Sequence, residues 1–165
     1  MIFIKKVLFV IALIIFSTSL FGCNNSNVIY DVKKFDVNNK DTQLNLAPKT
    51  IYKSNVIDLK ITDSLVINKD GLIEIDIDIK NNKNKKITVR AQKIFVNDIE
   101  IKGVFIDDVN PLETKNSELF IEIEDLIDKN IEKINKIVLD IHVEDYGSVG
   151  EGGEEYIESK LVSLN

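Results

Sequence analysis

The fold of this chain is decided by the stretch Ile73-Glu74-Ile75-Asp76-Ile77-Asp78-Ile79-Lys80, in which isoleucine occupies every second position. Successive side chains of a β-strand point to opposite faces, so this period places all the isoleucines on one face and all the charged residues on the other. β-Branched side chains also suit the pleated surface of a sheet. The stretch therefore predicts a strand with one dry face and one solvated face.

The same alternation recurs along the chain. Apolar residues occupy every second position in four further segments, at Ile57, Leu59 and Ile61; at Ile87, Val89 and Ala91; at Leu119, Ile121 and Ile123; and at Ile137, Leu139, Ile141 and Val143. Turn-forming residues separate these segments, at Asn68–Gly71, Asn81–Asn84, Asn97-Asp98 and Asn110-Pro111. Strands with one apolar face must stack in pairs of sheets to remove that face from water. The sequence therefore predicts an all-β, immunoglobulin-like antiparallel sandwich.

Two segments depart from this pattern. Between Lys93 and Val96 the parity of the apolar residues shifts, which predicts a β-bulge or a strand that changes sheets. From Glu124 to Ile134 the apolar residues take a helical spacing instead. We expect one or two helical turns there, in a short helix that crosses one end of the sandwich.

The N-terminus carries a different signal. Lys5-Lys6 precede an apolar run over 7–16, and Leu20-Phe21-Gly22-Cys23 follows, with the only cysteine of the chain. This layout is typical of an export signal. A transmembrane helix would need about 20 apolar residues, more than this run offers, and a disulfide would need a second cysteine.

The segment Leu20-Phe21-Gly22-Cys23 resembles the lipobox of bacterial lipoproteins. The resemblance implies cleavage between Gly22 and Cys23, with a covalent diacylglyceryl lipid on the Cys23 thiol and no other cofactor. We therefore expect residues 1–22 to be a removed signal peptide, residues 23–50 to be the lipidated cysteine and a polar tether, and residues 51–165 to be the sandwich domain. Val28-Ile29-Tyr30 is left open as a short edge strand within the tether.

The net negative charge limits the kinds of partner that the protein can bind. Removal of residues 1–22 would take away Lys5 and Lys6 and no acid, so the formal net charge would change from −6 to −8. Nucleic-acid binding needs a basic stripe, and none is visible in the sequence. Association with a membrane would depend on the lipid, since no polybasic segment adjoins it.

Candidate metal ligands lie at Asp76 and Asp78, on the solvated face with Glu74, and at Asp107 and Asp108 near a turn. Carboxylate oxygens would suit calcium. The spacing of a calcium-binding loop is missing, so we expect no metal site and a solvated face that Arg90 or Lys86 partly neutralises.

The acidic, glycine-rich stretch 144–155 is expected to be a mobile hairpin loop; a partner that docked on it would be cationic. The lone His142 lacks a second imidazole or a Ser-His-Asp arrangement and is expected at the surface. We therefore predict no catalytic residues.

Several motifs together resemble the immunoglobulin-like domain of Gram-positive surface lipoproteins. They are Ile77-Asp78-Ile79-Lys80-Asn81-Asn82, Ile87-Thr88-Val89, Val96-Asn97-Asp98, Pro111-Leu112-Glu113-Thr114-Lys115 and Asp140-Ile141-His142-Val143. The resemblance covers about residues 56–164; Asp98 and Glu113-Thr114-Lys115 depart from the family pattern. It implies a sandwich fold and a location at the cell surface, and it brings no catalytic set.

The expected function is that of a lipid-anchored, monomeric, non-enzymatic binding or accessory module. It would sit on the outer face of the cytoplasmic membrane and act on an unidentified envelope protein or ligand. A calcium- or ligand-sensing surface protein is the alternative.

Overall fold

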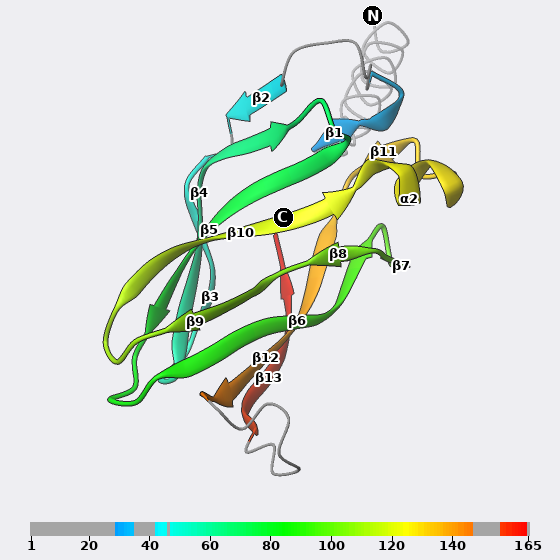
Figure 1. Ribbon diagram of the computed structural model, residues 1–165. Helices are drawn as coiled ribbons and strands as arrows, with labels where there is room; N and C mark the ends of the chain where they lie inside the picture. Colours follow the sequence, from blue (N-terminus) through cyan, green and yellow to red (C-terminus); the bar gives the residue numbers. More distant parts are fainter. Residues whose placement is uncertain (1–28, 35–41, 46, 147–155, 165) are drawn as a thin grey trace, which may run out of the picture.

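The computed structural model describes residues 29–34, 42–45, 47–146 and 156–164, which form two stacked antiparallel sheets (Figure 1). The strands are β1 (Tyr30–Asp31), β2 (Thr42–Asn45), β3 (Lys49–Lys53), β4 (Ile57–Ile67), β5 (Leu72–Asn81), β6 (Ile87–Val96), β7 (Ile99–Ile101), β8 (Gly103–Val104), β9 (Ile106–Val109), β10 (Thr114–Glu122), β11 (Lys133–Ile134), β12 (Ile137–Asp145) and β13 (Tyr156–Ser163). A 3-10 helix, η1 (Val32–Lys34), and an α-helix, α2 (Ile123–Asp128), complete the described elements.

The large sheet has six strands in the order β2-β4-β5-β10-β8, with β3 also paired to β4. The small sheet has five, in the order β13-β12-β6-β7, with β9 also paired to β6. β1 and β11 form a separate two-stranded pair. The predicted all-β antiparallel sandwich is therefore confirmed; its assignment to the immunoglobulin-like class stays a prediction.

The alternation in β5 works as its sequence predicts. Ile73, Ile75, Ile77 and Ile79 are at most 1% exposed, while the charged residues between them lie on the outer face of the large sheet. Full burial of one such side chain contributes about 1.5–3 kcal/mol. Strands β10 and β12 bury their own alternate residues in the same core.

A bulge interrupts the pairing of β6 with β12. The register passes from Asp140 opposite Lys93 to Ile141 opposite Ala91, which leaves Gln92 without a partner on β12. The predicted parity break is thus a bulge, one residue before the expected segment. The following turn confirms the hairpin prediction, because Asn97 and Asp98 both have positive φ, as a type I′ turn requires.

Residues 103–109 change sheets. β8 pairs with β10 in the large sheet, whereas β9 pairs with β6 in the small sheet. The residue between them, Phe105, is buried in the core, and its carbonyl accepts a hydrogen bond from the Ala91 amide at 2.8 Å. The crossing begins at Gly103. A glycine is required at this position because a Cβ would collide with the Phe120 carbonyl. The crossing separates β9 from β10 along the edge of the sandwich.

The helical prediction holds for its first half only. α2 begins directly after β10, and its buried Asp125 accepts hydrogen bonds from Lys129 Nζ at 2.8 Å and from the Lys102 amide at 2.7 Å. Both bonds favour the carboxylate and lower the pKa of Asp125. Residues 133–134 form β11 rather than helix, because Ile134 pairs with Tyr30.

Ordered structure reaches into the segment expected as a tether. Tyr30 and Val32 are buried in the core, and the Ile29 amide donates to the Ile134 carbonyl at 2.7 Å. Strands β2 and β3 also lie before residue 54. Strand β1 begins at Tyr30, the last residue of the segment left open as a short edge strand, while the division of the chain at residue 50 stays a prediction. Gly22, Cys23 and the signal segment lie outside the described residues.

Candidate functional site

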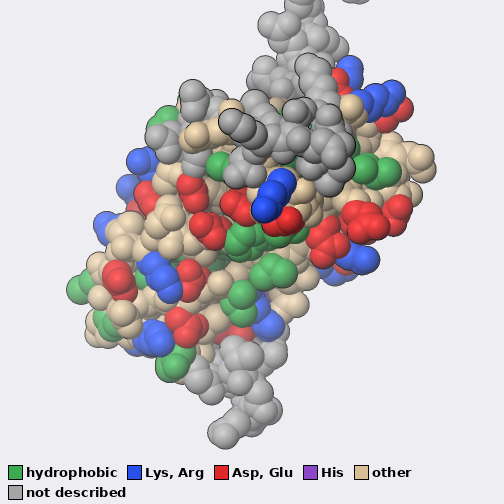
Figure 2. All heavy atoms as spheres, turned by 45° about the horizontal axis from the view of Figure 1, so that its top comes forward, with side chains coloured by type: hydrophobic (Ala, Val, Ile, Leu, Met, Phe, Trp, Pro, Cys, Tyr) green, Lys and Arg blue, Asp and Glu red, His purple; other side chains and the backbone are tan. Residues whose placement is uncertain are grey.

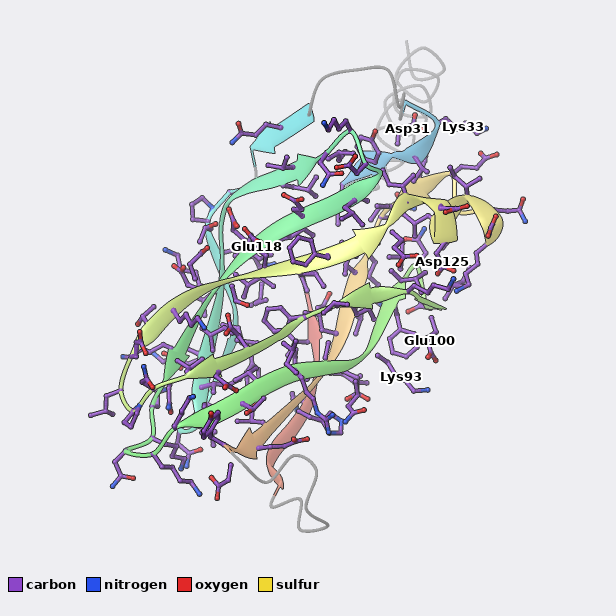
Figure 3. The ribbon with its side chains drawn as sticks, in the orientation of Figure 1. Asp31, Lys33, Lys93, Glu100, Glu118 and Asp125 are labelled. Atoms are coloured by element: carbon purple, nitrogen blue, oxygen red, sulfur yellow. The ribbon has the colours of Figure 1, made fainter. Side chains whose placement is uncertain are left out.

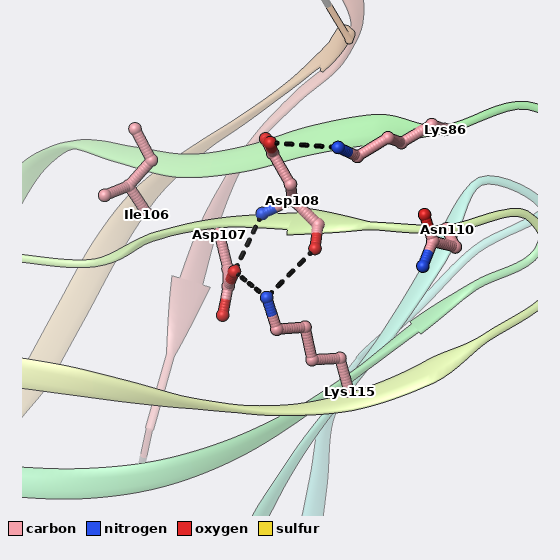
Figure 4. Close-up of a pocket in the computed structure, with 6 residues that line it drawn as sticks. All are labelled: Lys86, Ile106, Asp107, Asp108, Asn110 and Lys115. Carbon is pink, nitrogen blue, oxygen red and sulfur yellow. Dashed lines mark hydrogen bonds and ion pairs between the residues drawn. The ribbon is translucent and has the colours of Figure 1, made fainter.

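A shallow polar hollow lies on the edge of the sandwich where β9 has left the large sheet (Figure 4). It has a volume of about 540 Å³ and is lined by Lys86, Ile106, Asp107, Asp108, Asn110 and Lys115. β10 borders it on one side and β9 on the other, so the two sheets meet across it. The sheet crossing creates the hollow, since it leaves β10 with β8 beside it only at Phe120 and Ile121.

Lys115 closes the gap between the sheets. Its ammonium group forms an ion pair with the Asp107 carboxylate and donates to the Asp108 carbonyl at 3.2 Å. The Asp108 amide in turn donates to Asp107 Oδ1 at 2.8 Å. Asp107 therefore holds two donors from different elements, which leaves its carboxylate engaged within the protein.

Lys86 is held in the same way on the outer side of the hollow. Its Nζ lies 3.3 Å from Asp108 Oδ2 and 3.3 Å from the centre of the Tyr146 ring. Thr88 Oγ1 also donates to Asp108 at 2.8 Å. Desolvation disfavours the ammonium form of Lys86, but hydrogen bonding to Tyr146 and Asp108 outweighs it and raises the pKa.

Buried Asn81 fixes the loops that form the hollow. Its Nδ2 donates to the carbonyls of Lys85, Val109 and Asn110 at 2.8, 3.1 and 3.0 Å, and its Oδ1 accepts from the Lys83 amide at 2.8 Å. The side chain thereby joins the β5–β6 turn to the end of β9. Sequence analysis treated this asparagine as a turn former only; Lys83 and Lys85 belong to the same turn, whereas Val109 and Asn110 lie far along the chain.

Replacing Asn81 by alanine is expected to lower the free energy of unfolding by about 2–4 kcal/mol, because one buried and three partly buried backbone groups lose their partner together. Chemical denaturation monitored by circular dichroism measures the change. Asn84→Ala, at an exposed position of the same turn, is the matched control and should shift stability by no more than about 0.5 kcal/mol. Equal effects of the two substitutions would contradict the clamping role of Asn81.

The four candidate metal ligands do not come together. Asp76 and Asp78 lie on the outer face of β5, where Asp78 accepts a hydrogen bond from Asn116 at 3.1 Å. Asp107 and Asp108 lie at the hollow and are bound to lysines. Within the described ranges, no group of three or more His, Cys, Asp or Glu side chains is arranged to hold a metal ion.

Of the two cations expected to neutralise the candidate acids, Lys86 pairs with Asp108, whereas Arg90 lies on the small sheet and pairs with Glu144. Arg90 binds Glu144 through Nε at 2.9 Å and through Nη2 at 2.6 Å, and Glu144 is fully buried. Glu144 Oε2 has no hydrogen-bond partner among the described residues. Removing one member of a buried ion pair of this kind strongly destabilises the folded protein.

The two acids that begin the acidic stretch 144–155 are thus paired internally, since Asp145 also bonds Lys85 Nζ at 2.6 Å. The remaining acids of that stretch, Glu151–Glu155, lie outside the described residues. His142 lies on the outer face of the small sheet, half-buried, with Nε2 3.3 Å from Asp140 Oδ1. The strand carries His142 on its outer face as expected, but the side chain is only 18% exposed and its Nδ1 is buried.

Exposed apolar side chains follow the crossing segment along the edge of the sandwich, with Val104 and Phe120 on the large sheet and Ile106 on the small sheet. Val104 and Ile106 are 57% and 54% exposed, and Phe120 lies directly opposite Val104 and is half-buried. We call these three residues the apolar strip. In Figure 2, hydrophobic side chains gather near the middle of the view with acidic side chains on both sides of them.

Acids flank the apolar strip on the neighbouring strands. Glu74 lies opposite Phe120, and Glu118 lies opposite Asp76 on the adjacent strand (Figure 3). Like charges directly opposite each other in a sheet destabilise it. Sequence analysis missed the apolar strip because Val104 and Ile106 fall in a segment without clear alternation and Phe120 has the parity of a polar residue.

No protein-family model matches the chain, and no curated protein matches it. Among solved structures, the chain resembles the candidate lipoprotein YcdA of Bacillus subtilis, with 13% sequence identity and a TM-score of 0.41. The similarity covers 72% of this chain and 38% of that protein, so the chain spans well under two thirds of its length. A similarity this low assigns neither a family nor a function. Among the described residues, no helix has the length and apolarity needed to cross a bilayer.

Proposed function

We propose that the chain is an exported lipoprotein, held by a diacylglyceryl group on Cys23 at the outer face of the cytoplasmic membrane. Its sandwich would act there as a monomeric, non-enzymatic binding or accessory module of the cell envelope. The lipobox-like segment Leu20–Cys23 supports the address. The proposal includes membership of the immunoglobulin-like class of surface lipoprotein domains that the sequence resembles.

The observation that carries the binding role is the apolar strip with its acidic border. Neighbouring exposed apolar side chains with polar residues around them are typical of interaction sites. The acids Glu118 and Asp76, which lie opposite each other, would favour a cationic partner. The partner that fits best is a protein segment with apolar side chains and flanking lysines or arginines.

The polar hollow is a weaker candidate for the same role. Its charges, from Lys86, Lys115, Asp107 and Asp108, already neutralise one another as ion pairs. A charged ligand that entered would have to break one of these pairs. Their mutual pairing is also the reason for proposing a non-enzymatic function, since it leaves these groups engaged in structural contacts.

Photo-crosslinking on intact cells tests the binding surface. Phe120 is replaced by the aromatic crosslinker p-benzoylphenylalanine, which retains a ring at this position. We expect one discrete adduct whose partner, identified by mass spectrometry, is crosslinked through a basic segment. The adduct should weaken with rising salt, and the further substitution Glu118→Lys should remove most of it.

The matched control places the crosslinker at Leu161, which is 64% exposed on the outer face of the small sheet. Position 161 should give no comparable adduct. Equal adducts at positions 120 and 161, no adduct at either, or an adduct that Glu118→Lys leaves unchanged would each count against the apolar strip as the binding surface.

A further inference from the structure

The sandwich has two chemically different ends along its long strands. β1, η1, β11 and α2 lie together at one end, beside the close of β10 (Figure 1). The turns after β5 and β9, with the polar hollow, lie at the other end, where β10 begins. The nine residues of β10 separate these ends by about 27 Å.

The N-terminal attachment belongs to the first of these ends. The Ile29 amide is bonded to the Ile134 carbonyl, and Tyr30 and Val32 are buried in the core, so the chain is fixed to the fold from residue 29. Only residues 24–28 separate Cys23 from that point. Even fully extended, this link spans about 20 Å.

We propose that the end formed by β1, η1, β11 and α2 rests against the lipid headgroups, and that the hollow faces away from the membrane. The proposal depends on lipid anchoring at Cys23, which is the proposed function. An inverted molecule, with the hollow against the bilayer, would hold its attachment point about 27 Å above the surface, beyond the reach of the link. The length of the link therefore excludes the inverted orientation.

The first end is polar and carries charges of both signs. Lys33 and Glu132 form an ion pair there at 2.8 Å, and Lys129 and Lys133 are exposed beside them (Figure 3 labels Lys33). Ile127 on α2 is 55% exposed, so an apolar side chain also reaches the surface at this end. Acids lie along the side of the molecule on the outer face of β5 and β10, and Glu124 and Asp128 of α2 are exposed at the first end, so an anionic bilayer would repel both surfaces.

Fluorescence quenching in vesicles tests the orientation. The lipidated full chain is reconstituted in phosphatidylcholine vesicles that contain a headgroup nitroxide lipid. Because the Cys23 sulfur is consumed by the lipid, single new cysteines can be labelled at Asp128→Cys on α2 or at Asn84→Cys beside the hollow, both exposed positions. We expect loss of fluorescence at position 128 and full fluorescence at position 84.

The matched control inserts a 20-residue Gly/Ser segment between Asn25 and Ser26, which lengthens the link without altering the fold. Quenching at position 128 should then fall to the level at position 84. Equal quenching of the two labels with the natural link, or stronger quenching at position 84, would overturn the orientation while leaving anchoring intact. Failure of the chain to remain with the vesicles would overturn anchoring, and the orientation with it.

Discussion

Substitution of Ile77 by aspartate is expected to unfold the sandwich. Ile77 is 0% exposed at the centre of β5, between Ile61 on β4 and Ser117 on β10. The change removes about 1.5–3 kcal/mol of apolar burial and places a carboxylate where no cation can reach it. An unpaired buried charge costs several kcal/mol more. The sum is comparable to the total stability of a domain, about 5–15 kcal/mol.

Circular dichroism and urea denaturation measure this effect. The matched control is Asp76→Asn, one residue earlier, where the side chain lies on the opposite, solvated face of the large sheet. This substitution should change the free energy of unfolding by no more than about 0.5 kcal/mol, as for most surface substitutions. Any contact that Asp76 loses is offset by the removal of its charge from opposite Glu118. A folded Ile77→Asp protein with an unchanged midpoint would be incompatible with the stacking of the two sheets.

Substitution of Cys23 by alanine is expected to abolish membrane attachment, if the chain is a lipoprotein as proposed. Each buried methylene of an acyl chain contributes about 0.8 kcal/mol, and two chains give lasting attachment. No basic segment supports a residual interaction with the membrane. The protein should therefore leave the membrane fraction for the medium, or retain an uncut signal.

Cell fractionation and intact-mass analysis measure the result. The natural protein should begin at Cys23 and carry the added mass of the lipid. Ser26→Ala, three residues beyond the cysteine, is the matched control and should leave the mass shift and the membrane fraction unchanged. Normal cleavage with unchanged attachment of Cys23→Ala, or an unmodified thiol on the natural protein, would refute the lipid assignment.

Two experiments bear on the proposed orientation. Cys23→Ala tests whether an anchor exists, and the vesicle labels test which end it holds near the lipid. A partner bound at the apolar strip would contact the edge of the sandwich beside the hollow, since Ile106 belongs to both. Each proposal therefore has its own measurement: the orientation can fail while anchoring holds, whereas a failure of anchoring would overturn the orientation as well.

Some elements could be predicted from sequence because their cause is local. β5 and β12 follow from the alternation of isoleucine, leucine and valine with polar residues, since a period of two decides which face enters the core. The turn at Asn97-Asp98 follows from the tolerance of both residues for positive φ. The bulge near Lys93 follows from a break in the same alternation.

By itself, the sequence determined the strand class, the turns and the short helix, all of which depend on neighbours within a few residues. Only the tertiary structure decided which side chains meet: Lys115 with Asp107, Arg90 with Glu144, Asn81 with the end of β9, and Tyr30 with Ile134. The physical reason is that each of these contacts joins segments from different strands or loops. Periodicity fixes the face on which a residue lies, whereas the sheet order, the register and the crossing at Phe105 fix the residue that faces it.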